Sequence, residues 1–356
     1  MITNALISRL GIKLPIIQAP MASATTPDMV IAAAKAGALG SLGAAYMAPE
    51  EILAAIRYIR DQIDVPFQVN LFSPSPERML TNHVISAASQ RLTKIRADLG
   101  LDNLDELPEI KNNFNEQLEV VIREKIPIVG FHFGFPEAYF IEKVKSSGAF
   151  IVGCATRPVD ALALEEEGAD AIVAQGFEAG GHQGTFDGDE APSMLGLMAL
   201  VPQVIDVVSV PVIAAGGLMD GRGIAAVMRL GASAAQLGTA FLATPESKAH
   251  QKHKEILLST KYPSTRITRA FSGRPARGLI NVMMNYLDET PENILPFPYQ
   301  HSLTSKIRRE AARQDKPEYL SMWAGQGASM ARGQGTGEII TTLARELDST
   351  LAINQR

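Results

Sequence analysis

The stretch that most suggests chemistry is EAGGHQG, residues 178–184, which directly follows the apolar run DAIVAQGF at 170–177. It holds His182, one of six histidines in the chain, between three glycines. Glycines let a ligand approach the backbone closely, and an imidazole can take a proton from carbon or, when charged, hold an anion. A solvated loop histidine is the ordinary alternative. The position directly after a buried strand favours a catalytic role.

Other apolar runs also end in uncharged hydrogen-bonding groups and glycines. Such a set suits a large planar ligand with amide and carbonyl edges. A hydrolase would more often present paired carboxylates or metal ligands, so we expect no metal site. Besides His182, the groups at these ends are Gln18, Met21, Ala22, Asn70, His132, Gln175, Gly180, Gly216, Gly217, Gln236, Gly238 and Thr239.

Two glycine turns are candidates for binding a phosphate. They lie in AAGGLMDGRG (214–223) and QLGTAF (236–241). Barrels often hold phosphate with the loops after their seventh and eighth strands, where backbone N–H groups and a helix N-terminus reach the oxygens. Glycines that serve only tight turns are the alternative. A mononucleotide flavin would account for both the phosphate turns and the amide-lined ring.

His132 and Cys154 are weaker candidates. His132 ends an apolar run but lies among Phe131, Phe133 and Phe135, so a packed supporting histidine is about as well favoured as a ligand-binding one. Cys154 has no basic neighbour in sequence and is interpreted as a buried strand thiol, not as a nucleophile.

The elements that must position these groups are short apolar runs separated by amphipathic helical patterns. The runs are near-continuous, as in parallel strands buried on both faces. A Gly-Ala pair joins a helix end to the next strand at four places, where the glycine can adopt the left-handed conformation. Eight runs in alternation favour a (β/α)8 TIM barrel over an open doubly wound sheet, which stays the alternative. The runs are 15–21, 40–46, 66–72, 126–134, 150–156, 170–177, 211–218 and 234–242.

Two segments interrupt this alternation. Residues 73–125 are polar and helix-prone and exceed the length of one barrel helix, which predicts an insertion after the third strand. Residues 246–356 show no strand pattern, and we expect a mainly helical cap or flanking domain there. The predicted domains are therefore a flavin-binding barrel over 1–245 and a smaller helical domain over 246–356.

Composition excludes several classes of partner. The formal net charge of the 356 residues is −5 and like charges are not clustered, which argues against nucleic acid. The N-terminal stretch lacks the apolar core of a signal peptide, and no stretch is long and apolar enough for a membrane span. The single cysteine cannot form an internal disulfide, which favours a reducing compartment, the cytoplasm. A monomer and a homodimer are both open.

Several motifs together resemble the nitronate monooxygenases, formerly called 2-nitropropane dioxygenases. They are QAPM (18–21), NLF (70–72), FHFGFP (131–136) and EAGGHQG, followed by the two glycine turns and WAGQG (323–327). The resemblance covers essentially the whole chain. It is strongest to the bacterial and fungal class that oxidises propionate 3-nitronate.

The resemblance implies an FMN-dependent TIM barrel that oxidises nitronates with O2 to carbonyl products, releasing nitrite or related nitrogen oxides. It makes His182 the catalytic histidine, acting as base only when the neutral nitroalkane is the substrate. It also implies a substrate role for His132, Tyr299 as a wall and Lys306 as a cation for the substrate carboxylate. The implied FMN contacts are Met21, Ala22, Asn70, Gln175, Gly180, Gly217, Gln236, Leu237, Gly238 and Thr239.

Rival functions remain at this point. An FMN-dependent enoyl-acyl-carrier reductase and an NADH:quinone reductase share the barrel and similar loops. A barrel that only binds a phosphorylated ligand is the alternative without catalysis. QAPM and NLF favour the monooxygenase.

Overall fold

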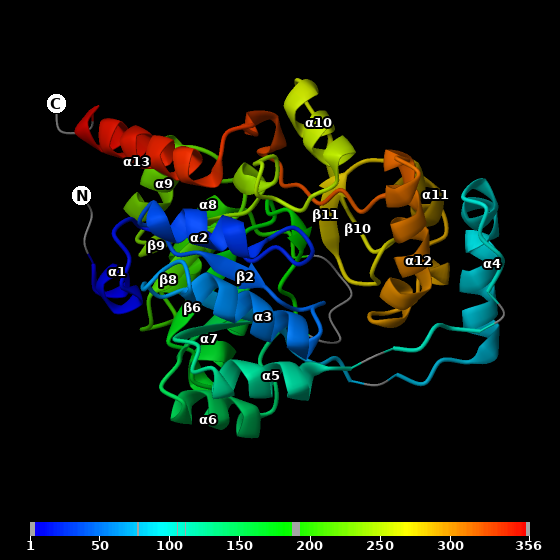
Figure 1. Ribbon diagram of the computed structural model, residues 1–356, viewed down its shortest axis with the longest axis horizontal. Helices are drawn as coiled ribbons and strands as arrows, with labels where there is room; N and C mark the ends of the chain where they lie inside the picture. Colours follow the sequence, from blue (N-terminus) through cyan, green and yellow to red (C-terminus); the bar gives the residue numbers. More distant parts are fainter. Residues whose placement is uncertain (1–3, 77, 105, 111, 187–192, 354–356) are drawn as a thin grey trace.

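The computed structural model describes residues 4–76, 78–104, 106–110, 112–186 and 193–353 (Figure 1). Eight strands pair in parallel in the order β1-β9-β8-β6-β5-β4-β3-β2. The two end strands are joined by a parallel bridge between Ile17 and Leu39, which closes the sheet. The TIM barrel is confirmed, and the open sheet is wrong. The strands are β1(Ile16–Gln18), β2(Ser41–Gly43), β3(Gln68–Phe72), β4(Ile128–His132), β5(Phe150–Ala155), β6(Ala171–Gln175), β8(Val212–Ala215) and β9(Ala234–Leu237).

The seam between β1 and β2 is closed partly by a side chain. The fully buried amide of Gln18 accepts from the backbone N–H of Ser41 at 3.1 Å and donates to the Ser41 carbonyl at 3.3 Å. A primary amide offers one donor group and one acceptor, so it can stand in for a backbone pair. Gln18, a polar residue at a strand end, therefore contributes to barrel closure.

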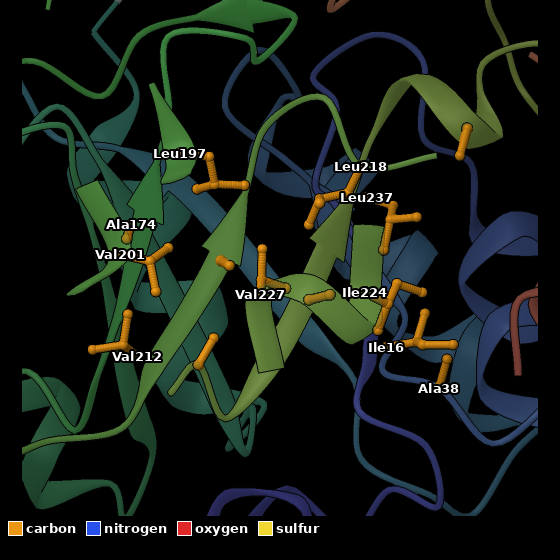
Figure 2. Close-up of a cluster of buried hydrophobic side chains, with 14 of the residues drawn as sticks. Ile16, Ala38, Ala174, Leu197, Val201, Val212, Leu218, Ile224, Val227 and Leu237 are labelled. Carbon is orange, nitrogen blue, oxygen red and sulfur yellow. The ribbon is translucent and has the colours of Figure 1, made fainter. Parts of the chain in front are cut away.

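Helices surround the barrel and bury its apolar strands. Figure 2 shows Ile16, Val212 and Leu237 from the strands beside Val201 and Ile224 from two of the helices. The four Gly-Ala glycines predicted to be left-handed have φ values of +91°, +85°, +103° and +104°. The helices on the barrel are α1(Ala5–Leu10), α2(Pro27–Lys35), α3(Pro49–Arg60), α5(Phe114–Arg123), α6(Ala138–Ser146), α7(Pro158–Glu166), α8(Leu197–Ile205), α9(Gly221–Arg229) and α13(Thr336–Ile353).

A second layer, which we call the cap layer, covers one end of the barrel. It consists of α4(Asn82–Asp98), α10(Gln251–Ser259), α11(Val282–Asp288), α12(Tyr299–Arg313) and the strands β10(Thr265–Thr268) and β11(Ala276–Leu279). Figure 1 shows α4, in cyan, beside the orange α11 and α12. Leu92 and Ile95 of α4 share a hydrophobic core with Leu303 and Ile307 of α12. Short 3-10 helices complete the chain: η1(Thr239–Phe241), η2(Pro291–Asn293), η3(Pro317–Tyr319) and η4(Ala328–Met330).

Two segments cross between the layers. The inserted segment 73–125 does not form one unit. Its first helix, α4, belongs to the cap layer, whereas its second helix, α5, packs on α3 and β3 of the barrel. The C-terminal helix α13 in turn packs on α2 and α9, on the barrel and away from the cap layer (Figure 1). The cap layer is thus built from two distant parts of the sequence.

The C-terminal part also contains strands, where the sequence predicted none. β10 and β11 pair antiparallel, and β11 pairs with β7(Gly181–His182). The register places Ala276 opposite His182. TRIT and ARGL were missed because each is four residues long and interrupted by polar groups or glycine. The segment around His182 is accordingly a paired strand, not a free glycine turn. Among the described residues, no helix has the length and apolarity needed to cross a membrane.

Candidate active site

A cavity of about 650 Å³ lies at the carboxyl ends of the barrel strands, under the cap layer. Its volume falls within the range of about 300–1,000 Å³ typical of ligand and cofactor sites. The barrel contributes the ends of its strands, and the cap layer contributes Phe271, Ser272, His301 and Arg308.

Most of the residues singled out from the sequence line this one cavity. Three do not. Leu237 is 1% exposed and packs in the hydrophobic core. Tyr299 bonds through its hydroxyl to the backbone of Arg78, and Lys306 is exposed on α12. Those in the lining are Met21, Ala22, Asn70, His132, Gln175, Gly180, His182, Gly217, Gln236, Gly238 and Thr239.

His182 projects from β7 into a shell of aromatic rings and one hydroxyl. Its Nε2 lies 2.8 Å from Ser272 Oγ. Its ring centroid lies 5.9 Å from that of Phe72, 5.7 Å from Phe133 and 5.4 Å from Trp323. Burial lowers the pKa of His182 well below 6.5, and the nearby His132, His301, Arg274 and Arg308 lower it further. The imidazole of the free protein is therefore neutral at pH 7 and able to accept a proton.

The backbone of this segment is held by two side chains from neighbouring strands. Gln175 Nε2 donates to the His182 carbonyl at 3.0 Å, and its Oε1 accepts from the Gly184 N–H at 2.7 Å. His132 Nε2 lies 3.2 Å from the same carbonyl. Because a carbonyl only accepts, this nitrogen carries the proton. Burial lowers the pKa of His132 to about 4, so it is a neutral donor that both faces the cavity and supports His182.

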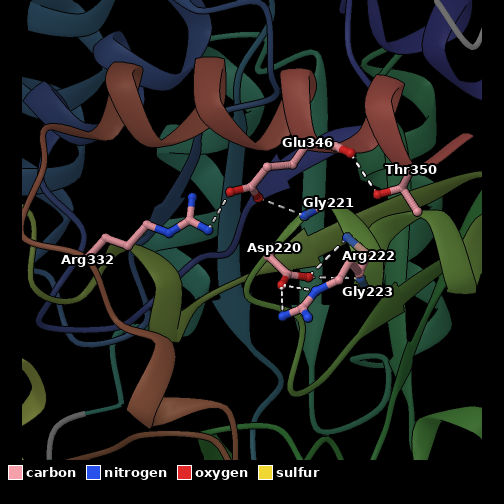
Figure 3. A network of polar contacts seen from close by, with 7 residues as sticks. All are labelled: Asp220, Gly221, Arg222, Gly223, Arg332, Glu346 and Thr350. Carbon is pink, nitrogen blue, oxygen red and sulfur yellow. Dashed lines mark hydrogen bonds and ion pairs between the residues drawn. The ribbon is translucent and has the colours of Figure 1, made fainter. Parts of the chain in front are cut away.

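Both glycine turns reach the cavity. The first N–H groups of α9, the helix after the first turn, are already hydrogen-bonded to carboxylates. Asp220 accepts from the N–H groups of Arg222 and Gly223 at 3.0 and 3.1 Å. Glu346 of α13 accepts from the Gly221 N–H at 3.0 Å and pairs with Arg332 at 2.8 Å (Figure 3). The expectation that this helix N-terminus would reach the phosphate is wrong, since two carboxylates already fill its donors.

The backbone of the two glycine turns, by contrast, is a candidate for binding phosphate. Gly216 and Gly217 have φ values of +130° and +65°, which few residues with a side chain adopt. Gly238 precedes η1 and, being a glycine, has no side chain with which to cap its first N–H groups. Gly217, Gly238 and Thr239 line the same cavity. They are the groups that could receive a phosphate.

Sequence reasoning missed the charged part of the cavity. Five of the six histidines line it, together with Lys248, Arg308 and Arg309, and no acidic side chain does so among the described residues. A cavity with cations and no carboxylate favours an anionic ligand. The described residues contain no group of three His, Cys, Asp or Glu side chains suited to a metal ion.

The buried histidines predict a specific acid sensitivity. His253 is 6% exposed, and burial lowers its pKa from 6.5 to about 4. Between pH 6.5 and about pH 4, His253 is protonated in the unfolded chain but stays neutral in the folded protein. The stability is therefore complete above pH 6.5 and falls as the pH drops to about 4. We expect His253→Gln to reduce this acid-dependent loss by on the order of 2 kcal/mol, measured by urea unfolding at pH 7.5 and pH 4.5. Equal losses in both proteins would contradict the burial of a neutral imidazole.

Comparison with known proteins agrees with this geometry. The family model described as nitronate monooxygenase matches residues 3–346. A probable nitronate monooxygenase of Staphylococcus saprophyticus is 36% identical over 96% of this chain and 97% of its own length. One of Bacillus subtilis is also 36% identical, over 96% and 99%.

Two solved structures share this fold over the whole chain. Nitroalkane oxidase from Streptomyces ansochromogenes superposes with a TM-score of 0.90 at 38% identity, covering 99% of this chain and all of that one. FabK from Thermotoga maritima superposes with a TM-score of 0.79 at 28% identity, covering 100% and 99%. A neutral, half-buried histidine that can accept a proton, in a cation-lined barrel cavity, thus occurs in a chain related to these proteins over its whole length. The chain belongs to the nitronate monooxygenase family and is a flavin-dependent oxidoreductase.

Proposed function

We propose that the protein oxidises alkyl nitronates, propionate 3-nitronate among them, with FMN as cofactor and O2 as electron acceptor. The products are carbonyl compounds together with nitrite or related nitrogen oxides. The observation that carries this proposal is the neutral, half-buried His182 in a cavity that offers cations and, among the described residues, no carboxylate. Such a cavity receives an anion and can also form one from a neutral carbon acid.

The donor set of the cavity fits FMN. The backbone at Gly217, Gly238 and Thr239 would hold the phosphate, because these positions line the cavity and the N-terminus of α9 is occupied. Bound FMN would supply the redox chemistry by accepting electrons from the nitronate and passing them to O2. The residues that would contact the ring are Met21, Ala22, Asn70, Gln175, Gly180 and Gln236.

The role of His182 depends on the substrate. With a neutral nitroalkane, a ring nitrogen takes the proton from the carbon bearing the nitro group, and the electrons of the C–H bond pass into that group to form the nitronate. With a preformed nitronate no proton is removed, and the residue orients the anion. Ser272 fixes the imidazole through the 2.8 Å hydrogen bond to its Nε2.

Anaerobic titration tests the proposed function directly. We expect the purified protein to be yellow, to release FMN alone on heating, and to be bleached by propionate 3-nitronate without oxygen. FAD as the only flavin would refute the cofactor assignment. Bleaching by NADH but not by the nitronate would favour a reductase, and a colourless protein that cannot be reconstituted with FMN would favour a ligand-binding barrel.

A further inference from the structure

We infer that Arg308 selects nitronates that carry a carboxylate, and that His301 and Tyr46 hold its guanidinium in position. The inference rests on the proposed function and extends it, because it assigns recognition of the far end of the substrate to a particular side chain. The family resemblance implies Lys306 for this task, but Lys306 is exposed and outside the cavity lining.

Arg308 is a half-buried cation that has no acidic partner among the described residues. It lines the cavity from α12. Within the described part of the chain its hydrogen bonds run only to His301, from Nη2 to Nδ1 at 3.2 Å and to the carbonyl oxygen at 3.1 Å. Its Nε is buried and makes no hydrogen bond there. A charge that is partly withdrawn from water without an anion beside it is costly, so the arrangement favours an anionic ligand.

His301 orients the guanidinium. Since Arg308 can only donate, Nδ1 of His301 is the accepting, unprotonated nitrogen. Burial, reinforced by the charge of Arg308, lowers the pKa of His301 to about 3. The ring is therefore neutral and does not form an ion pair with an anionic ligand. Its ring stacks on Tyr46 with centroids 4.5 Å apart and planes 18° apart. Two rings, one from the loop after β2 and one from α12, thus support the arginine.

Tyr46 adds a neutral donor beside the cation. It lines the cavity and is 38% exposed. Burial among protein atoms raises the pKa of its hydroxyl to about 12. The phenol is therefore protonated at neutral pH and can donate a hydrogen bond to an anion held by Arg308.

The arginine and the catalytic histidine serve the same cavity. The positive charge of Arg308 is among the causes that lower the pKa of His182, and both side chains line the space. A guanidinium matches a carboxylate with two parallel hydrogen bonds. A nitronate with a terminal carboxylate can therefore place its reacting carbon toward His182 and its carboxylate on Arg308.

The test compares two substrates in three flavin-loaded variants. For Arg308→Gln we expect kcat/KM to fall about 10- to 100-fold for propionate 3-nitronate, the loss typical of a charge-assisted hydrogen bond. For propyl-1-nitronate, which has the same carbon chain without the carboxylate, we expect less than about a threefold change. Arg308→Lys should recover part of the loss. Lys306→Gln removes a charge from the exposed side of the same helix and should change the two substrates equally little.

A propionate-binding measurement tests the role of Arg308 without any turnover of substrate. Propionate should perturb the flavin absorbance of the wild-type holoenzyme saturably, and this effect should be lost in Arg308→Gln but kept in Lys306→Gln. Equal losses for both nitronates, loss of flavin from Arg308→Gln, or an effect confined to Lys306→Gln would each overturn the inference. If the wild type oxidises no nitronate, the proposed function fails, and the propionate titration still decides whether Arg308 binds carboxylates.

Discussion

Replacing His182 with asparagine is expected to lower turnover of neutral nitroalkanes by about 10²–10⁴-fold, the usual contribution of a general base. Asparagine keeps a polar group of similar reach but cannot accept a proton. Turnover of the preformed nitronate should fall much less, because its proton has already gone. Steady-state kcat/KM values for nitroethane and ethyl nitronate, measured in parallel, give the comparison.

Two controls make this result specific. Flavin content must match the wild type, because Gly180 and the backbone carbonyl of His182 are part of the same cavity wall. The wild-type profile for the nitroalkane should also be flat from pH 7 upward until substrate ionisation intervenes, since the pKa of His182 lies well below 6.5. Small, equal losses on both substrates in a flavin-replete variant would show that His182 is not the base.

Substituting Gly238 with valine is expected to abolish flavin binding while leaving the barrel folded. Gly238 has a φ of −109°, which a residue with a side chain adopts without strain. An added Cβ would lie 3.6 Å from Ala19 Cβ and from Met21 Sδ, ordinary contact distances. Both neighbours line the cavity, so the new side chain would occupy space beside the proposed phosphate turn.

Gly217 would be a less informative position for this experiment. Its φ of +65° strains any side chain, and a Cβ would lie 3.0 Å from Glu178 Cβ. Absorbance at 450 nm per protein, with circular dichroism and the unfolding midpoint as controls, measures the Gly238→Val outcome. A folded variant that purifies fully yellow would remove this turn from the cofactor site.

The barrel could be predicted because its signals are local. Buried parallel strands are continuously apolar, and a glycine after a helix shows as a repeated Gly-Ala pair, so the eight strands are visible in the sequence. Most of the lining residues follow from the rule that barrel sites lie at the carboxyl ends of strands. His182 could be named for the same reason.

The sequence indicated a mainly helical cap over 246–356, but not its strands or its inclusion of α4, because those contacts join distant segments. β7 has two residues and is a strand only because β11 pairs with it. α4 and α5 come from the same inserted segment, and only tertiary packing shows that one joins the cap layer and the other the barrel. On α12 a weaker signal existed: His301 and Arg308 are seven residues apart and share a helical face, whereas Lys306 is not on that face.

The composition of the cap layer has a consequence for synthesis on the ribosome. Leu92 and Ile95 of α4 find their apolar partners, Leu303 and Ile307, only after about 200 further residues have been made, roughly 10–40 s at ordinary translation rates. Until then the apolar face of α4 is bare and open to aggregation or to chaperones. β7, which contains His182, likewise cannot pair until Ala276 of β11 has been synthesised. Catalytic competence therefore comes only after the cap layer has been synthesised, and the packing of α13 on α2 and α9 is the last step in completing the barrel.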